Sequence, residues 1–254
     1  MAGSAQSVFL AAPYPRVFAH RGLAQDAPEN TLLAFAKALA AGATHLETDV
    51  HVSRDGVAVI SHDPDLAALG RDVRIDQLAI AELKRINLGF GQSFTSLADA
   101  LEAFPAARFN IDIKTDAAAE PAARAIRDLR ATPRVLVTSF NEPRRKHVVG
   151  LLPGVVSSAS ASLVARAIAA ANLGLYAQVR RTLRACIAVQ VPERAGPVRI
   201  TTPRFVAMMH RAGVEVHAWT INDPLDMIRL LDLGVDGLVT DRTDLAVAAV
   251  TSRS

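Results

Sequence analysis

The hydrophobic positions of the chain follow two alternating periods. Short runs rich in β-branched and aromatic residues are followed by longer runs rich in Ala and Leu, and the pair repeats along the sequence. The runs that predict strands are residues 16–20, 45–53, 108–114, 134–140, 155–158, 186–191, 215–221 and 237–241. The runs that predict helices are residues 31–41, 96–104, 118–129, 142–151, 162–171, 203–212, 224–232 and a last segment after Thr243. This alternation is typical of parallel strands joined by helical crossovers.

Eight such units in 254 residues predict an α/β fold, an eight-stranded parallel (β/α)8 TIM barrel. A doubly wound open sheet is the alternative. A turn that starts at His20 follows the first strand. It lacks the Gly-x-Gly-x-x-Gly pattern of dinucleotide-binding open sheets. We find no Pro- or Ser-rich linker, so we expect residues 1–254 to form a single domain.

One segment is longer than a single helical crossover requires. Asp55-Gly56 lies between two extended runs, which indicates a β-hairpin after the second strand. With a two-residue turn, Arg54 pairs with Val57, and by continuation Asp49 lies opposite His62. Residues 63–95 then form a small insertion over the barrel mouth, with a short helix near residues 79–86.

Polar and apolar side chains alternate along residues 45–53. Glu47 and Asp49 therefore point to the same side of the strand, about 7 Å apart. We expect the apolar side to pack on helices and the two carboxylates to point into the barrel mouth. Their mutual repulsion would be relieved by a divalent cation, which prefers oxygen ligands. A surface strand with two solvated acids is equally compatible with this spacing.

The strand at residues 108–114 shows the same alternation. Asn110, Asp112 and Lys114 form its polar side, which suits a barrel mouth better than a core. Asp112 could supply a third carboxylate ligand, and Lys114 could contact a phosphate. An ordinary ion pair between the two residues is the alternative.

Two histidines are expected near these acids. His20 ends the first strand, and the hairpin returns His62 to the level of Asp49. A single histidine is more often a packing residue, but two histidines beside several carboxylates favour proton transfer at neutral pH. With a cation, Arg21 and Lys114 to neutralise a phosphodiester, the set fits phosphoryl transfer. The sequence contains no Gly-x-Ser-x-Gly motif that would indicate a serine hydrolase.

Composition narrows the function classes. The chain is 50% hydrophobic, which excludes a disordered protein. Its net charge of +3 suits an anionic small molecule and is too small to indicate a nucleic-acid partner. The single cysteine, Cys186, excludes an internal disulfide and a cysteine-based metal site. We find no signal-peptide pattern, and Arg166 and Asn172 interrupt the longest apolar stretch, so we predict no transmembrane segment and a cytoplasmic location.

The sequence resembles the glycerophosphodiester phosphodiesterase family, which shares its active-site plan with phosphatidylinositol phospholipases C and sphingomyelinases D. The resemblance covers almost the whole chain. The matching stretches are Ala19-His20-Arg21-Gly22, Ala27-Pro28-Glu29-Asn30-Thr31, Leu46-Glu47-Thr48-Asp49-Val50, Asp55-Gly56, His62-Asp63, Ile111-Asp112-Ile113-Lys114, Thr138-Ser139-Phe140, Trp219-Thr220-Ile221-Asn222, Gly234-Val235-Asp236-Gly237 and Thr240-Asp241.

The resemblance implies a barrel enzyme that hydrolyses glycerophosphodiesters to sn-glycerol 3-phosphate and an alcohol. It makes His20 and His62 the catalytic acid–base pair. The other roles it implies are one Mg²⁺ or Ca²⁺ ion bound by Glu47, Asp49 and Asp112, and a substrate held by Arg21, Lys114 and Trp219.

The sequence departs from the family pattern in two places. The family usually has Glu where this chain has Asp112, which is one methylene shorter, and we keep Asp112 as a ligand. An Arg-Thr-Thr run usually follows the His-Asp pair, but here residues 66–71 read Leu-Ala-Ala-Leu-Gly-Arg. In the family, the insertion that contains these residues helps to select the alcohol. The resemblance therefore defines the alcohol part of the substrate least well.

Three further features receive mainly structural interpretations. Asn30 or Thr31 is expected to cap the first helix, and Glu29 to anchor the loop after His20. The basic run at residues 144–146 is interpreted as a solvated helix face, with weak contact to an anionic membrane surface as the alternative.

Two other functions remain possible at this stage. One is a lysophospholipase D or sphingomyelinase D-like activity on a lipid. The other is a non-catalytic barrel that binds a phosphorylated ligand. The low aromatic content of 5% favours a small-molecule substrate. The sequence leaves open the alcohol, the metal, the oligomeric state, and whether water or the glycerol hydroxyl attacks first.

Overall fold

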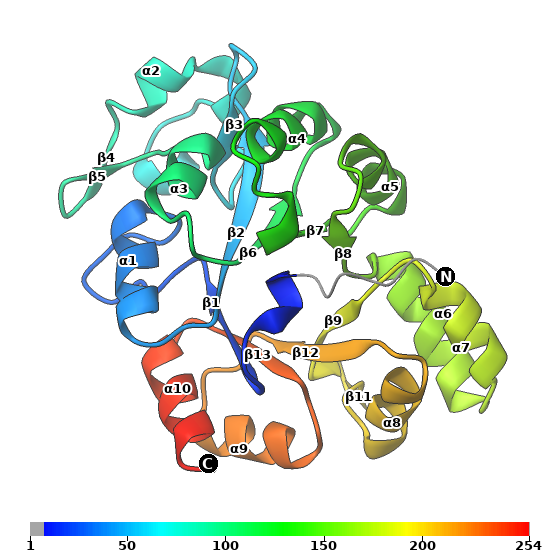
Figure 1. The fold of residues 1–254 in the computed structure, drawn as a ribbon. Coiled ribbons are helices and arrows are strands. Elements are labelled where there is room, and N and C mark those ends of the chain that lie inside the picture. Colours follow the sequence, from blue (N-terminus) through cyan, green and yellow to red (C-terminus); the bar gives the residue numbers. More distant parts are fainter. Residues whose placement is uncertain (1–7, 254) are drawn as a thin grey trace.

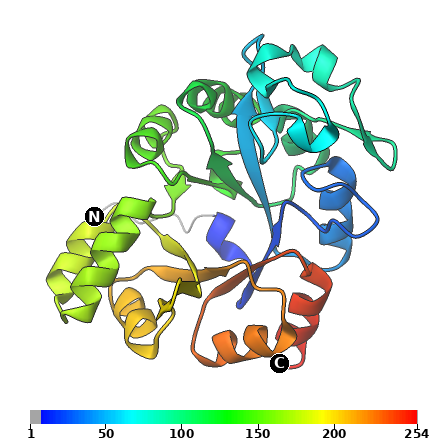
Figure 2. The same cartoon turned by 180° about the vertical axis from the view of Figure 1, so that it is seen from behind.

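A ring of parallel strands lies at the centre of the computed structural model, which describes residues 8–253 (Figures 1 and 2). The strands pair in the order β8-β7-β6-β2-β1-β13-β12-β9, and a single bridge between Ser158 and Ala188 joins the two ends. They are β1 (Arg16–His20), β2 (His45–Val52), β6 (Phe109–Ile113), β7 (Val135–Thr138), β8 (Val156–Ser157), β9 (Ala188–Pro192), β12 (Glu215–Trp219) and β13 (Gly237–Thr240). The predicted eight-stranded barrel is confirmed, and the open-sheet alternative is not.

Helices surround the barrel where the sequence pattern predicts them. They are α1 (Leu32–Ala40), α3 (Leu97–Ala103), α4 (Ala119–Asp128), α5 (Glu142–Leu151), α6 (Ala161–Asn172), α8 (Pro203–Arg211), α9 (Pro224–Asp232) and α10 (Thr243–Thr251). Short 3-10 turns occur at η1 (Val8–Ala11), η4 (Asp116–Ala118) and η5 (Thr132–Arg134). No helix among residues 8–253 is long and apolar enough to span a membrane.

Two elements between α6 and α8 were not predicted. The apolar run after residue 161 is two helices, because Gly174 adopts a left-handed φ of +73° and α7 (Tyr176–Leu183) begins just beyond it. After β9, a small hairpin forms from β10 (Arg194–Ala195) and β11 (Val198–Arg199).

The hairpin after β2 has a different register from the predicted one. β3 (Ala58–Ile60) pairs with β2 so that Val50 lies opposite Ile60, one residue away from our prediction. The loop contains three residues, 54–56, and Gly56 adopts φ +76°, the geometry of a three-residue hairpin loop. Ser61, not His62, therefore lies opposite Asp49, and its backbone N–H donates to the Asp49 carbonyl at 3.1 Å.

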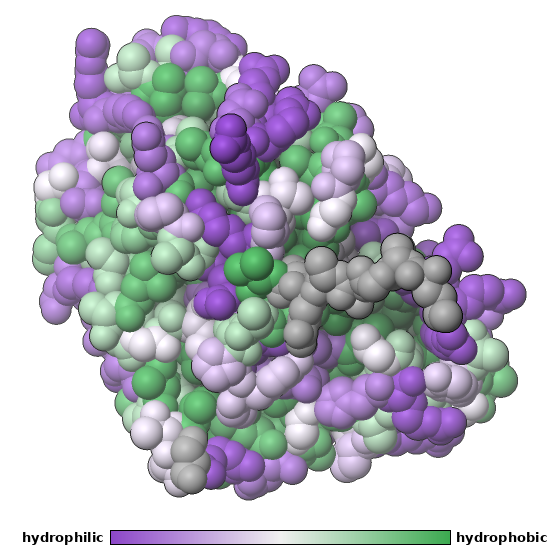
Figure 3. All heavy atoms as spheres, viewed as in Figure 1, coloured by the Kyte–Doolittle hydropathy of each residue, from purple (hydrophilic) through white to green (hydrophobic). Residues whose placement is uncertain are grey.

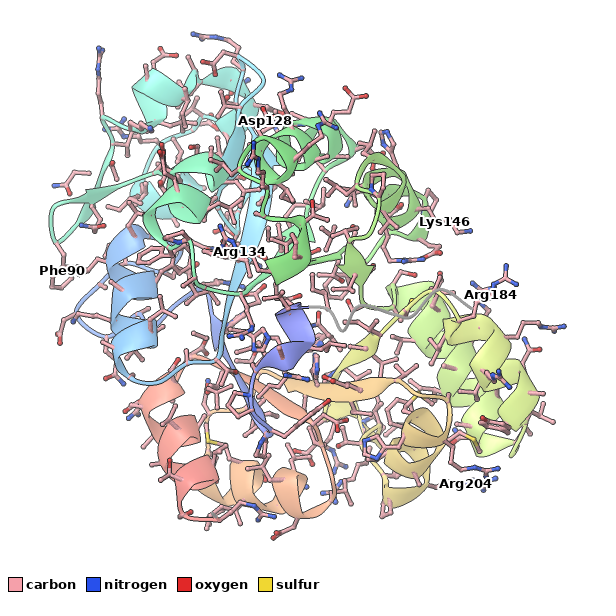
Figure 4. The ribbon with its side chains drawn as sticks, in the orientation of Figure 1. Phe90, Asp128, Arg134, Lys146, Arg184 and Arg204 are labelled. Carbon is pink, nitrogen blue, oxygen red and sulfur yellow. The ribbon has the colours of Figure 1, made fainter. Side chains whose placement is uncertain are left out.

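Residues 63–95 form a small lobe with its own apolar cluster. Its elements are η2 (Ala67–Leu69), η3 (Ile75–Gln77), α2 (Ile80–Leu83), β4 (Asn87–Gly89) and β5 (Gln92–Ser93), and α2 corresponds to the predicted short helix. Leu66, Ile75 and Leu83 pack around Val59 of β3. The lobe projects outward beyond α1 and α3, with Phe90 at its outer edge (Figures 1 and 4). None of its residues lines the large pocket described below.

The assignment of residues 1–254 to a single domain stays a prediction.

Apolar side chains fill the space between strands and helices, and a separate group fills the inside of the barrel. Hydrophilic side chains project around the perimeter of the face shown in Figure 3. Inside the ring, η1 places Phe9 against Phe18 and His45 (Figure 1). The His45 ring stacks on Phe18 at 4.5 Å, and burial lowers the pKa of His45 to about 3. This end of the barrel is therefore closed by packed, uncharged rings.

A buried ion pair ties the start of β1 to β12. Arg16 is fully buried, and its Nε lies 2.8 Å from Glu215 Oε2. The remaining guanidinium nitrogens donate to the carbonyls of Ala12 and Leu10 at 2.8 and 2.9 Å. Burial alone would raise the pKa of Glu215, but hydrogen bonds from Arg16 and His217 hold it well below its usual range.

Replacing Glu215 by Gln removes the carboxylate that neutralises the buried Arg16 charge and should lower the free energy of unfolding at pH 7 by about 3 kcal/mol. Because the folded-state pKa of Glu215 is depressed, its contribution is complete above its unfolded pKa of about 4.3 and is lost as the pH falls further. Urea denaturation at several pH values should show the difference between wild type and variant shrinking below about pH 4. A difference that is constant down to pH 3 would contradict the assigned role.

Candidate active site

A pocket of about 460 Å³ lies at the carboxyl ends of the barrel strands. All the side chains predicted to form the site line it: His20, Arg21, Glu47, Asp49, His62, Asp112, Lys114 and Trp219. Their convergence follows from the fold, because the carboxyl ends of parallel barrel strands meet at one rim. The register places His20 beside Glu47, and Asp49 beside Asp112.

The acidic residues of the pocket are buried. Glu47 is 7% exposed and Asp49 2%, which excludes the alternative of two solvated surface acids. Lys114 Nζ lies 2.7 Å from Asp49 Oδ1 and 2.8 Å from Asp112 Oδ2. Arg21 Nε lies 3.3 Å from the other Asp49 oxygen. The ion pair considered for Asp112 and Lys114 is therefore present, and it also includes Asp49.

The charge of Glu47 is the least compensated of the group. Its Oε2 accepts one hydrogen bond, from the backbone N–H of Arg21 at 3.1 Å. Burial, followed by repulsion from Asp49 and Asp112, raises the pKa of Glu47 well above its usual value. Burial also raises the pKa of Asp112, although Lys114 opposes this effect. For Lys114, burial would lower the pKa, but Asp112 and Asp49 raise it overall.

The residue types at this position fit a divalent cation. Asp112 Oδ1 is buried and has no hydrogen-bond partner, and the ionised form of Glu47 is disfavoured by burial and by the neighbouring carboxylates, an effect that a cation would offset. Among residues 8–253, however, no three acidic or histidine side chains converge closely enough to form a ready coordination shell. Lys114 instead lies between Asp49 and Asp112 and pairs with both.

Each pocket histidine is held by an aspartate at the same ring nitrogen. His20 Nδ1 lies 2.6 Å from Asp241 Oδ1, and His62 Nδ1 lies 2.7 Å from Asp63 Oδ1. The hydrogen bond with His20 is the largest of the effects that lower the pKa of Asp241. Within the described residues, Nε2 of both rings is left without a protein partner. A histidine held in this way can exchange a proton through Nε2.

His62 reaches the pocket although the predicted register is wrong. β3 ends at Ile60, so strand alternation no longer controls where the side chains of the next residues point. His51 Nε2 lies 3.1 Å from the His62 carbonyl, and the Ser61 hydroxyl donates to the Asp63 carbonyl at 3.0 Å. These contacts fix the turn that carries His62.

The loop after His20 depends on an unusual backbone. Arg21 adopts φ +57°, and Gly22 adopts φ +85°. A Cβ atom at Gly22 would lie 2.7 Å from the backbone of Ala34, so only glycine fits between the loop and α1. As expected, Glu29 anchors this loop: Arg21 donates to both of its carboxylate oxygens, at 3.0 and 3.2 Å.

Asn30 does not cap α1, and Thr31 does. The Thr31 hydroxyl accepts from the Ala34 N–H at 3.3 Å. Asn30 instead donates from Nδ2 to Asp49 Oδ2 at 3.2 Å, and its Oδ1 accepts from the Thr48 hydroxyl at 2.8 Å. The side chain of Asn30 therefore positions Asp49.

The roles of three site residues, Asp63, Asn222 and Asp241, were not predicted from the sequence, although all three belong to the motifs that match the family. Asp63 and Asp241 hold the two histidines, and Asn222 holds Asp241 by a donated bond at 2.8 Å and an accepted one at 2.9 Å. Asn222 and Asp241 follow the ends of β12 and β13, where barrel strands deliver polar residues to the mouth. Their position directly after two predicted strands could have identified these polar residues as part of the site.

The basic run at residues 144–146 is mostly not a solvated face. Arg145 is 3% exposed and binds Glu142 at 2.7 Å, and Arg144 donates to the Lys114 carbonyl at 2.6 Å. Of the three residues only Lys146 is exposed. Figure 4 shows it at the edge of the molecule, beside α5. Arg144 thereby supports the end of the strand that carries Asp112 and Lys114.

Comparisons with known proteins agree with this geometry. The model of the glycerophosphoryl diester phosphodiesterase family matches residues 20–245. A probable glycerophosphodiester phosphodiesterase 2 of Mycobacterium tuberculosis is 43% identical over 89% of this chain and 87% of its own length. The crystal structure of a glycerophosphodiester phosphodiesterase from Thermotoga maritima is 28% identical, with a TM-score of 0.72 over 91% of this chain and 96% of that one.

A further solved structure supports the fold. It is an Oleispira antarctica phosphodiesterase in complex with the product sn-glycerol-3-phosphate, 23% identical, with a TM-score of 0.77 over 97% of this chain and all of that one. The family match covers most of the residues that carry the barrel and the pocket. The chain therefore belongs to the glycerophosphoryl diester phosphodiesterase family and is, as predicted, a phosphodiester-hydrolysing enzyme.

Proposed function

We propose that this enzyme hydrolyses glycerophosphodiesters to sn-glycerol 3-phosphate and an alcohol, using His20 and His62 as acid and base and one divalent cation. The observation that carries the proposal is the pairing of each histidine with an aspartate at Nδ1, in a pocket that also contains three buried carboxylates. Such a pocket combines groups for proton transfer with groups for binding charge.

The cation would be Mg²⁺ or Ca²⁺, held by oxygens of Glu47, Asp49 and Asp112. When bound, it would withdraw charge from the phosphate oxygens. Lys114 and Arg21 are charged and only partly buried, with side chains 22% and 18% exposed, so they can contact the phosphate from the pocket wall. We assign Trp219, which also lines the pocket, to the binding of the substrate's organic part.

In the proposed reaction, Nε2 of one histidine accepts a proton from the attacking oxygen, which belongs to water or to the glycerol hydroxyl group; in the second case a water molecule then opens the cyclic phosphate that forms. A new bond forms from that oxygen to phosphorus, and the bond from phosphorus to the alcohol oxygen breaks. Nε2 of the other histidine gives its proton to the departing oxygen, so that the alcohol leaves neutral. Asp241 and Asp63 keep each ring in one orientation throughout.

The substrate class is tested by assaying glycerophosphocholine, glycerophosphoethanolamine and lysophosphatidylcholine side by side with product identification. The proposal expects sn-glycerol 3-phosphate from the first two substrates. Turnover of the lysolipid alone would favour the lysophospholipase D alternative. The cytoplasmic location and the absence of a nucleic-acid partner stay predictions.

Asp241 should act as a positioning residue for His20. Replacing Asp241 by Asn removes the carboxylate that lies 2.6 Å from His20 Nδ1 and holds the ring in one orientation, so kcat should fall by about 100-fold while KM changes by less than about twofold. Asp244→Asn is the matched control, because Asp244 pairs with Arg242 and does not line the pocket. If KM rises as much as kcat falls in D241N, or if D244N loses as much kcat, Asp241 does not act by positioning His20.

A further inference from the structure

The pocket has two chemically different halves. The charged half comes from β1, β2, β6 and the residues that follow them. The other half is mainly apolar and comes from the ends of β7, β9 and β12 together with α6. The glycerol and phosphate parts of a glycerophosphodiester are polar, so they would bind in the charged half and not against this apolar half.

The apolar half continues along one face of α6. Ala161, Val164, Ala165 and Ile168 all line the pocket, at the i, i+3, i+4 and i+7 spacing of a single helix face. We call these four residues the α6 stripe. It extends about 10 Å along the helix, at a rise of about 1.5 Å per residue. Ala161 and Ala165 are exposed, and Val164 and Ile168 are half-buried, so the stripe forms an open trough.

The stripe takes only a partial share in packing α6 on the barrel: Val164 and Ile168 are half-buried against the main core cluster, whereas Ala161 and Ala165 are exposed and outside it. A different face of the helix, with Leu163, Ala167 and Ala171, is buried in the main core cluster. Arg166, the one charged residue of α6, is exposed and does not line the pocket. Trp219 and the 61% exposed Phe140 line the same pocket and meet edge to face at 6.1 Å. An exposed apolar face that leads out of an active-site pocket marks a binding surface for an apolar group.

We infer that the α6 stripe is a subsite for an alkyl chain carried by the phosphodiester substrate. This inference rests on the proposed function and deepens it: among the diesters that the enzyme hydrolyses, those that bear an aliphatic group should bind more tightly. The small side chains of Ala161 and Ala165 leave room for the alkyl chain, and Val164 and Ile168 supply contact area along it. The alkyl chain could belong either to the departing alcohol or to an acyl group on the glycerol.

Binding of n-alkyl phosphates from ethyl to octyl tests the subsite without turnover. A fully buried methylene improves affinity about fourfold, so a half-open trough should lower Kd about twofold per methylene until the chain passes Ile168. Ala165→Trp fills the trough and should remove the dependence on chain length while leaving Kd for ethyl phosphate unchanged. Ala169→Trp is the matched control, because Ala169 is exposed on the same helix one turn away but does not line the pocket. A Kd that is independent of chain length in the wild type, or equal slopes in A165W and A169W, would overturn the inference.

Turnover assays identify which part of the substrate carries the alkyl chain. One series extends the departing alcohol of glycerophospho-n-alkanols, and the other extends the acyl group of short-chain lysophosphatidylcholines below their micellar concentration. A rise in kcat/KM with length in either series supports the subsite and names the substrate, and a flat profile in both contradicts it. Hydrolysis of glycerophosphocholine tests the proposed function separately, because its failure would leave the alkyl phosphate binding result valid.

Discussion

Replacing His20 by Ala is expected to lower kcat/KM on glycerophosphocholine about 1,000-fold, because general acid–base catalysis contributes about 100- to 10,000-fold. His62→Ala should have a comparable effect. His20 is at the pocket wall with Asp241 at its Nδ1, so its removal deletes a proton carrier without opening the core. Steady-state kinetics with a circular dichroism melt of each variant would measure both effects.

The chain offers a matched control for these variants. His210 also binds an aspartate, with Nε2 at 2.8 Å from Asp236, but it is on α8 outside the pocket. His210→Ala should keep wild-type turnover within about twofold. An H20A enzyme that cleaves every diester as fast as H210A does would show that the acid–base assignment is wrong.

Removal of divalent cations is expected to abolish turnover, and Glu47→Gln to weaken cation binding by at least about tenfold. The reason is that Glu47 is buried beside Asp49 and Asp112, and a cation relieves the repulsion that raises its pKa. A proton and the cation should compete for this carboxylate, so cation affinity should fall as the pH is lowered. Isothermal titration with Mg²⁺ or Ca²⁺ alone measures the affinity without relying on activity.

Glu102→Gln is the control for the charge change, because Glu102 is exposed on α3 and does not line the active-site pocket. It should bind the cation as the wild type does. Full activity in excess chelator, or equal cation affinity in E47Q and E102Q, would contradict a metal site at these carboxylates.

The placement of the acidic residues could be predicted because strand alternation and barrel topology determine it. Once residues 45–53 are read as a strand, Glu47 and Asp49 must share a side, and a neighbouring parallel strand brings Asp112 beside Asp49. The fold followed from the same periodicity, including the exact span of α5 and α9.

The hairpin register could not be predicted from Asp55-Gly56 alone. A left-handed glycine fits both a two-residue turn and the three-residue loop that forms here. The loop has one contact within the hairpin and one from outside it: Asp55 accepts bonds from the Ser53 hydroxyl at 2.6 Å and from the Ile80 N–H at 2.9 Å. The second of these joins residues far apart in the sequence.

The partners of the histidines and the role of α6 were also outside the reach of sequence patterns. The pairing of Asp241 with His20 spans 221 positions and depends on how the loop after β13 turns. In α6, small apolar residues occur on several faces, and periodicity cannot tell which face meets the pocket. The low aromatic content favoured a small-molecule substrate, and it gave no sign of the aliphatic side chains that line part of the pocket.

The central claim is that both histidines and the three carboxylates act on one phosphate. A crystal structure with a divalent cation and sn-glycerol 3-phosphate tests it most directly. The account predicts the cation on oxygens of Glu47, Asp49 and Asp112, with phosphate oxygens within hydrogen-bond distance of Nε2 of His20 and His62. A phosphate bound away from either ring, or a cation bound elsewhere, would contradict it.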